Sequence, residues 1–388
     1  MQVAKSVWQY HDKGDDFKPV FEYFKYCSNE AIRIGLEENI TSKYALRKRL
    51  YHQLRIDSKF HCKYVYGAVF AAAAKLKMYR RMIKRKPDAK IPRFRKNYFV
   101  LYSETCKIEN DSLRIPMEPG RYIFIRLTKY ILDMIREGRV ARFVITDEKL
   151  IISYSRLIPE RKPDFFIGID RNLDNVTSFD SRGTVIIHDL SETQRIVAKY
   201  TKVMSHFKRN DSRIKRKIFQ KYGRLQRNRI QNILHCTSKK VVSQNGEIVM
   251  ENLKGIRKLF KKGNGKGRKY RRKLNSWSFY ELQRQIEYKA RWIGLPVKYV
   301  RPHGTSSRCA ICGSKLVPEE HRQMFCPSCT SIVDRDVNAA KNILLRGIRV
   351  MPDGIADEAM MAESGNKQPV TCRVDAIKSA NQDNIKPA

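Results

Sequence analysis

Two pairs of cysteines constrain the fold of this 388-residue chain more than any other feature. Each pair has the spacing Cys-x-x-Cys, and thirteen residues separate one pair from the other. Gly, Pro and Ser residues next to the pairs favour turns, so that each pair can direct two thiolates at one point. Four thiolates form the closed tetrahedral site that structural zinc prefers. We therefore predict one structural Zn²⁺ ion bound by Cys309, Cys312, Cys326 and Cys329.

The other cysteines do not indicate a second metal site or a set of disulfides. Five of them are scattered singly along the chain, which does not indicate a disulfide framework. His321 lies between the two cysteine pairs but off their spacing, so we expect a surface residue there rather than a zinc ligand. The amino terminus lacks the apolar stretch of a secretory signal. The longest apolar run, residues 64–74, is too short to span a bilayer.

The charge of the chain indicates a polyanionic partner. Lys and Arg number 79 against 39 Asp and Glu, a formal charge of +40. Neutralising phosphates releases condensed counterions, and this makes nucleic acid the natural partner of such a chain. One alternative is that the charge attracts anionic lipid. Another is that it only maintains solubility or reflects a hot habitat. We expect a cytoplasmic, nucleoid-associated protein of a prokaryotic cell, with no membrane partner and either monomeric or dimeric.

The hydrophobic pattern predicts an α/β protein with additional β and α-helical parts. Residues 2–10 alternate as a strand, residues 16–86 have helical spacing, and residues 97–157 contain short strands separated by turns. We expect the first strand to join this β unit, which makes the helical block an insertion into it. From residue 161 onward strands and helices alternate. Residues 347–388 lose all periodicity, which predicts a disordered tail. The strands expected after residue 161 cover 165–170, 176–179, 185–190, 248–251 and 297–301, with helical regions at 192–236 and 276–293.

Acidic residues end two of the apolar strands, Asp170 after residues 165–169 and Glu251 after residues 248–250. A carboxylate at the end of a buried strand is costly unless a cation compensates it, and Mg²⁺ ions would do so. The alternative for each acid alone is that it begins a solvated turn. Asp174 and Asp180 are nearby acids whose polar surroundings favour such a turn role.

A third acid, Asp336, begins a predicted helix. It shares one helix face with two alanines, an isoleucine and a leucine at positions 339, 340, 343 and 344. The alanines would let this face approach a sheet closely and bring Asp336 toward the strand ends. Asp334 points elsewhere and suits the N-cap position. We therefore predict that Asp170, Glu251 and Asp336 bind two catalytic Mg²⁺ ions, as in phosphodiesterases that stabilise the attacking water and the leaving 3′ oxygen with two metals.

Basic segments surround these acids. Residues 199–229 are rich in Lys and Arg with interleaved aromatic residues, and residues 261–273 are nearly all Lys, Arg and Gly. Contacts to a duplex backbone are the functional interpretation, and a solvated helix face is the alternative. The candidate nucleic-acid-binding residues are Lys261, Lys262, Arg268, Arg271 and Arg272.

Several short motifs in combination resemble the transposon-encoded TnpB (OrfB) proteins, which are relatives of the type V CRISPR effectors. They are Gly168-Ile169-Asp170, the run from Met250 to Ile256, Thr305-Ser306 before the first cysteine pair, and the run from Asp334 to Ile343. The close part of the match extends from about Asp164 to Leu345. One departure is the turn of residues 171–175, where the family often has a glycine and this chain has none.

The resemblance implies a RuvC-like nuclease domain of the RNase H fold at residues 161–304 and 331–346, with a zinc ribbon inserted at 305–330. It also implies a β wedge domain at 1–14 and 94–160, interrupted by a helical recognition domain at 15–93. Asp170, Glu251 and Asp336 fall on the catalytic positions of the family.

The function implied by the resemblance is Mg-dependent, RNA-guided DNA cleavage, with a guide RNA from the transposon end and double-stranded target DNA as partners. The alternatives are a cleavage-deficient guided repressor and an auxiliary protein of transposition and DNA recombination. A self-sufficient single-strand transposase would need a paired-His metal motif, and no His-x-His occurs in the chain.

Overall fold

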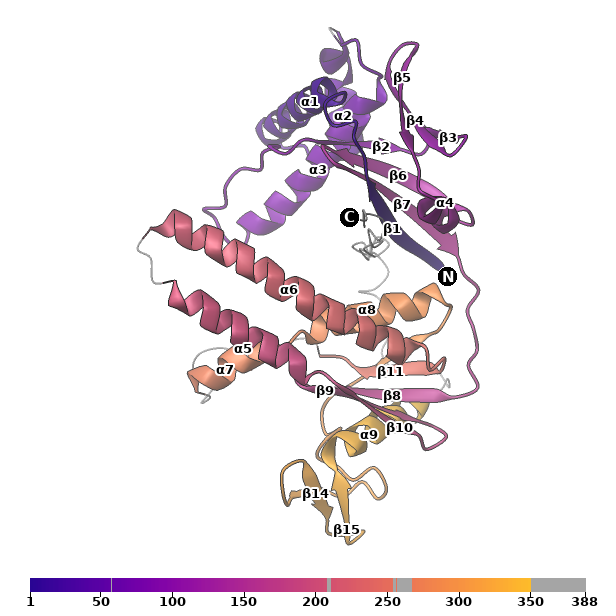
Figure 1. Cartoon of the computed structure of the whole chain (residues 1–388), viewed down its shortest axis with the longest axis vertical. Helices are drawn as coiled ribbons and strands as arrows, with labels where there is room; N and C mark the ends of the chain where they lie inside the picture. Colours follow the sequence, from indigo (N-terminus) through magenta and orange to yellow (C-terminus); the bar gives the residue numbers. More distant parts are fainter. Residues whose placement is uncertain (57, 208–210, 254–255, 257–266, 350–388) are drawn as a thin grey trace, which may run out of the picture. The chain divides into compact units, whose positions relative to one another are not determined.

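The structure is a computed structural model that describes residues 1–349 apart from 57, 208–210, 254–255 and 257–266. The chain divides into two compact units (Figure 1). One unit is Gln2–Leu157. The other contains Met1 and the described residues of 158–349. Each unit has its own β-sheet and its own buried core.

The Gln2–Leu157 unit is built on an antiparallel sheet in the order β1-β7-β6-β2. The first strand pairs with the last one, from Gln2 opposite Leu157 to Tyr10 opposite Lys149, so it joins the β unit as the sequence predicted. A separate sheet in the order β3-β4-β5 and the short helix α4 complete the β part. The elements are β1 (Gln2–Tyr10), β2 (Tyr98–Tyr102), β3 (Lys107–Glu109), β4 (Ser112–Glu118), β5 (Arg121–Arg126), α4 (Lys129–Ile135), β6 (Arg139–Thr146) and β7 (Lys149–Leu157).

Three helices lie between β1 and β2 in sequence: α1 (Lys18–Glu37), α2 (Lys43–Arg55) and α3 (Lys63–Ile83). Each has an apolar stripe at helical spacing, and in α2 the stripe is Leu46, Leu50 and Leu54, which are all buried. Aromatic rings join the helices to the sheet. The ring of Phe99 in β2 lies 5.2 Å from that of Tyr64 in α3, centroid to centroid.

The second unit contains a five-stranded sheet in the order β10-β9-β8-β11-β12. Strand β8 pairs in parallel with β11 and in antiparallel with β9, so β8 and β11 have their carboxyl ends at the same edge. Ile169 lies opposite Met250 in this register. The strands are β8 (Phe166–Arg171), β9 (Asn175–Asp180), β10 (Val185–Asp189), β11 (Glu247–Glu251) and β12 (Val297–Val300).

Helices cover one face of this sheet. Ile167, Ile169, Ile248 and Met250 belong to the same core cluster as buried residues of α6 and α8. The basic helical region expected at 192–236 consists of two helices, and Asp211 caps the second by accepting from the backbone N–H of Arg213 at 2.7 Å. The helices are α5 (Ser191–His206), α6 (Ser212–Val242), α7 (Arg268–Asn275) and α8 (Phe279–Trp292).

Helix α9 (Arg335–Arg349) covers the opposite face (Figure 1). Two glycines permit this close approach, because a Cβ at Gly168 would overlap the carbonyl oxygen of Ala340 and a Cβ at Gly347 would crowd Val249. The predicted start of the disordered tail at residue 347 is wrong, because α9 continues to Arg349. The rest of that tail, 350–388, lies outside the described residues.

A small three-stranded sheet lies between β12 and α9 in sequence. Its strands are β13 (Val317–Pro318), β14 (Gln323–Cys326) and β15 (Ser331–Asp334), and β15 leads directly into α9. Cys309 and Cys312 precede the sheet, and Cys326 and Cys329 lie at and just after the end of β14. The predicted zinc module is therefore a single small β structure. Within the described part of the chain, no helix is both long and apolar enough to cross a bilayer.

Candidate metal centre and its neighbours

The structure brings the three predicted acids to one edge of the five-stranded sheet. Asp170 lies at the end of β8, Glu251 ends β11 beside it, and Asp336 lies in the first turn of α9. All three are buried, with 8%, 9% and 7% of their surfaces exposed. Asp170 experiences the negative charge of both other acids. The predicted grouping of these residues is therefore present in the fold.

The environment of Asp170 and Glu251 disfavours the charged forms of these two acids. Burial raises the pKa of Asp170 to about 7, with a further contribution from the charge of Glu251, while a hydrogen bond from Asn172 opposes the shift. Burial also raises the pKa of Glu251 against the hydrogen bond that it accepts from Thr305. The Oγ1 of Thr305 lies 2.5 Å from Oε1 of Glu251. A divalent cation would offset this cost, and oxygen ligands suit Mg²⁺.

The cysteines form a compact group of possible metal ligands. Among the residues that the structure describes, the four cysteines are the one cluster of His, Cys, Asp or Glu side chains placed to hold a metal ion, and their Sγ atoms all lie within 4.8 Å of one another. The three carboxylates do not form such a cluster.

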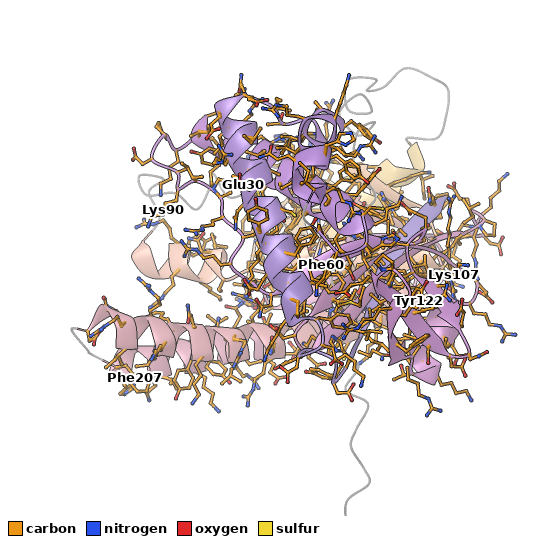
Figure 2. The ribbon with its side chains drawn as sticks, turned by 90° about the horizontal axis from the view of Figure 1, so that it is seen from above. Glu30, Phe60, Lys90, Lys107, Tyr122 and Phe207 are labelled. Carbon is orange, nitrogen blue, oxygen red and sulfur yellow. The ribbon has the colours of Figure 1, made fainter. Side chains whose placement is uncertain are left out.

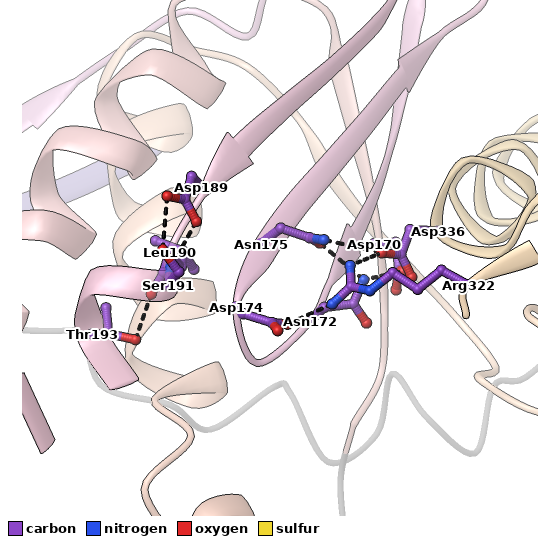
Figure 3. A network of polar contacts seen from close by, with 10 residues as sticks. All are labelled: Asp170, Asn172, Asp174, Asn175, Asp189, Leu190, Ser191, Thr193, Arg322 and Asp336. Carbon is purple, nitrogen blue, oxygen red and sulfur yellow. Dashed lines mark hydrogen bonds and ion pairs between the residues drawn. The ribbon is translucent and has the colours of Figure 1, made fainter. Parts of the chain in front are cut away.

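Arg322 contacts the acid group from the turn between β13 and β14 (Figure 3). Its Nη1 donates to Oδ2 of Asp336 at 2.5 Å, and its Nη2 donates to Oδ1 of Asp174 at 2.8 Å. The amide of Asn175 donates to the same Oδ2 of Asp336 at 3.0 Å. No pattern in the sequence predicts that Arg322 and Asn175 contact Asp336. Asp174, predicted as a turn residue only, is in addition a partner of Arg322.

The other nearby acids have local roles. Asp334 caps α9, because its Oδ1 accepts from the backbone N–H groups of Asp336 and Val337 at 2.9 Å each. Asp180 accepts from the backbone N–H groups of Arg182 and Thr184 in the turn after β9. Both roles match the predictions. The turn at 171–175 forms without a residue at positive φ, so it needs neither Gly nor a left-handed Asn.

A buried arginine holds the ends of two strands in place. Arg171 follows Asp170 and is 3% exposed. Its Nη2 donates to the carbonyl oxygen of Glu251 at 2.6 Å, and its Nη1 donates to Oε1 of Gln283 in α8 at 2.7 Å. These bonds fix the end of β11 relative to β8 and α8. Nothing in the sequence distinguishes Arg171 from the other arginines.

The cysteine geometry fits a zinc ion. The Sγ atoms of Cys309 and Cys329 are 3.9 Å apart, and those of Cys312 and Cys326 are 3.5 Å apart. A tetrahedron with Zn–S bonds of about 2.3 Å has S–S edges of about 3.8 Å. His321 is exposed and is not part of the group. Four thiolates complete the coordination of zinc, which is typical of a structural site.

Hydrogen bonds join the cysteine module to α9. The side chain of Asn338 donates to the carbonyl oxygen of Arg308 at 2.8 Å and accepts from the backbone N–H of Ala310 at 2.9 Å. Asn342, one turn later, donates to the carbonyl oxygen of Thr305 at 2.8 Å. Residues on both sides of Cys309 are therefore attached to the helix that contains Asp336.

The structure describes the side chains of only two of the five candidate nucleic-acid-binding residues. Lys261 and Lys262 lie outside the described residues. Arg268 begins α7, but its side chain is not described. Arg271 is half-buried and Arg272 is exposed on the same helix.

The basic helices α5 and α6 lie side by side as a hairpin. The ring of Phe207, which follows the end of α5 and is labelled in Figure 2, stacks on that of Tyr222 in α6 at a centroid distance of 5.8 Å.

Known proteins resemble this chain in sequence and in fold. Residues 279–343 match the family model described as Cas12f1-like, TNB domain, and residues 20–116 match that of the uncharacterized protein MJ0013 family. The TnpB-like protein MJ0751 of Methanocaldococcus jannaschii is 32% identical over 61% of this chain and 91% of its own length. The putative RNA-guided DNA endonuclease InsQ of Escherichia coli is 25% identical over 69% and 71%.

The fold is shared with a solved structure, that of a Cas12f1–sgRNA–target DNA complex. Its TM-score is 0.58 at 14% identity, over 85% of this chain and 82% of that chain. The chain therefore has the fold of this Cas12f1 structure, and its residues 279–343 are similar to the Cas12f1-like TNB domain. By its similarity to MJ0751, the chain belongs to the TnpB-like family.

Proposed function

We propose that this protein is an RNA-guided DNA endonuclease that hydrolyses phosphodiester bonds with two Mg²⁺ ions bound by Asp170, Glu251 and Asp336. The observation that supports it most is the placement of these buried acids from two strand ends and one helix at a single sheet edge. No purely structural role requires three acids to share this position, because their burial is unfavourable without a cation.

The strand order supports a RuvC-like assignment of the second unit. Three antiparallel strands, β10, β9 and β8, continue into two parallel ones, β11 and β12, with α9 on one face. We assign residues 161–304 and 331–346 to this nuclease domain and 305–330 to a zinc ribbon. In the other unit we assign 1–14 and 94–160 to a wedge domain and 15–93 to a helical recognition domain.

The partners that we propose are a guide RNA from the transposon end and double-stranded target DNA. The E. coli relative is named a putative RNA-guided DNA endonuclease, and the similar Cas12f1 structure contains sgRNA and target DNA. The net charge of +40 is consistent with both partners.

The chemistry follows from the polar groups around the acids. Bound Mg²⁺ would stabilise the attacking water and the leaving 3′ oxygen. Asn172 and Thr305 orient the carboxylates of Asp170 and Glu251 through hydrogen bonds of 2.8 and 2.5 Å. The guanidinium of Arg322 pairs with the carboxylate of Asp336 in the structure. In a complex with DNA it would donate to phosphate oxygens, because a guanidinium matches phosphate with two parallel N–H groups.

The test uses protein purified together with its bound RNA. Sequencing should return one discrete RNA, and DNA that matches it should be cut in Mg²⁺. Asp170→Ala or Glu251→Ala should abolish cutting while the circular dichroism spectrum stays unchanged. Occupied but uncut DNA with the unmodified protein would instead favour a guided repressor, and an untemplated RNA mixture would contradict guidance.

A further inference from the structure

A hollow on the surface of the Gln2–Leu157 unit is lined by residues of α2 and α3. Tyr44, Arg47 and Tyr51 lie three to four residues apart on α2, and Tyr66 approaches them from α3. This spacing places side chains on one helix face. The volume of the hollow is about 480 Å³, which falls within the range of about 300–1,000 Å³ usual for ligand sites.

Aromatic rings form a continuous row at the hollow, because Tyr66 and Phe70 of α3 lie 6.5 Å apart and connect two further ring pairs. The rings of Tyr51 and Tyr66 are 5.5 Å apart at 76°, and those of Tyr44 and Phe70 are 5.9 Å apart at 81°. Tyr44 is 59% exposed and does not belong to the core of the unit. The buried face of α2 is formed by its leucine stripe instead. The exposed ring of Tyr44 and the half-buried rings of Tyr51 and Tyr66 offer faces on which planar groups stack.

Cations surround the same rings. The guanidinium of Arg47 lies 4.9 Å from the ring centre of Tyr66, and Nζ of Lys43 lies 4.8 Å from those of Tyr44 and Phe70. Lys48 is exposed at the rim. None of the described residues that line the hollow is acidic. An occupant should therefore combine planar rings with negative charge.

We propose that this aromatic hollow, formed by α2 and α3 around Tyr44, Tyr51 and Tyr66, binds unpaired nucleotides of a nucleic acid. Bases stack on the tyrosine rings, while Lys43, Arg47 and Lys48 neutralise the adjoining phosphates. An acidic peptide would pair with the cations but would not stack on the row of rings, so it fits the hollow less well than a nucleotide does. This site is separate from the metal centre and does not rest on the nuclease proposal.

The first experiment maps contacts directly, with the full-length protein in magnesium-free buffer so that cleavage plays no part. Single-stranded DNA and RNA containing iodouracil are irradiated with the protein, and the cross-linked peptides are identified by mass spectrometry. We expect cross-links at Tyr44, Tyr51 or Tyr66. Cross-links confined to other regions would overturn the proposal, and the two oligonucleotides distinguish DNA from RNA as the occupant.

The second experiment measures affinity with a fluorescent single-stranded oligonucleotide and with a duplex of the same length. Tyr44→Ala should weaken single-strand binding by about tenfold and duplex binding much less, since stacking on a ring is lost. Tyr44→Phe should retain it. The matched control is Tyr10→Ala, which removes another exposed tyrosine with a lysine at 5.0 Å from its ring.

Two results would contradict the site. Equal loss for single strand and duplex would indicate a general electrostatic surface. Equal loss in Tyr10→Ala and Tyr44→Ala would remove any special role of the hollow.

Discussion

Nη1 of Arg322 lies 2.5 Å from Oδ2 of Asp336, although fourteen positions separate the two residues in the chain. The contact joins the zinc module to the helix that contains the third acid. It also places a permanent cation beside a carboxylate that we assign to Mg²⁺.

Replacing Arg322 should reduce catalysis without raising the Mg²⁺ requirement. In Arg322→Ala we expect DNA cleavage at saturating Mg²⁺ to fall by about tenfold to a thousandfold, because a charged donor to the phosphate is lost. Arg322→Lys should be intermediate, since an ammonium cannot form two parallel bonds. The charge-matched control is Arg335→Ala, on the exposed side of α9. Single-turnover rates test this, and normal cleavage by Arg322→Ala would contradict it.

Thr305 should act as a positioning residue for Glu251. Thr305→Val removes the donor at 2.5 Å while keeping the volume, so the carboxylate loses its orientation. We expect a higher Mg²⁺ concentration at half-maximal cleavage and a smaller change in the maximal rate. Thr305→Ser should restore the wild-type requirement. A Val variant with an unchanged Mg²⁺ titration would show that the hydrogen bond has no such role.

The zinc ion should act through the hydrogen bonds to α9. One zinc per chain is expected by elemental analysis, and Cys312→Ser should lose both zinc and cleavage. Asn338→Ala should keep the zinc but cut more slowly, because Asn338 attaches α9 to the residues beside Cys309. Cys236→Ser, at an exposed single cysteine, is the control. Full activity of a zinc-free protein would contradict the structural role.

The stability of the magnesium-free protein should depend on pH through Asp170. The pKa of Asp170 is about 7 in the folded protein against 3.8 for an aspartate free in water, so the folded state binds more protons between these values. Stability therefore falls as the pH rises through this window. Asp170→Asn should raise the free energy of unfolding at pH 8 by on the order of 2–4 kcal/mol, and by much less at pH 5. Urea titrations at both pH values test this; an equal effect at both would contradict it.

The close contact between β8 and α9 should make Gly168 intolerant of a side chain. Gly168→Ala should destabilise the second unit by about 1–3 kcal/mol, because the new Cβ overlaps the backbone of Ala340. Gly223→Ala, where no atom lies within 4 Å of the added Cβ, should instead stabilise α6 by about 0.5–1 kcal/mol. Chemical denaturation compares the two. An unchanged midpoint for Gly168→Ala would contradict this packing.

The sequence predicted the groups that depend on local pattern. The cysteine site follows from the Cys-x-x-Cys spacing, the acids at the strand ends follow from apolar runs, and the face of Asp336 with Ala339 and Ala340 follows from the helical period of 3.6 residues. Arg322 and Asn175 could not be predicted, because their contacts with Asp336 arise from tertiary folding and not from spacing. The division of residues 192–236 into two helices could not be predicted either, because the basic composition continues between them.

The central claim is that Asp170, Glu251 and Asp336 form one metal centre. The most direct test is the rate of Mg²⁺-dependent cleavage of matching DNA by Asp170→Asn, Glu251→Gln and Asp336→Asn, each purified with its RNA. Asp334→Asn is the control, because asparagine caps a helix as well as aspartate does. We predict that cleavage falls below detection in all three variants and persists in the control. Cleavage at the wild-type rate by any of the three would contradict the account.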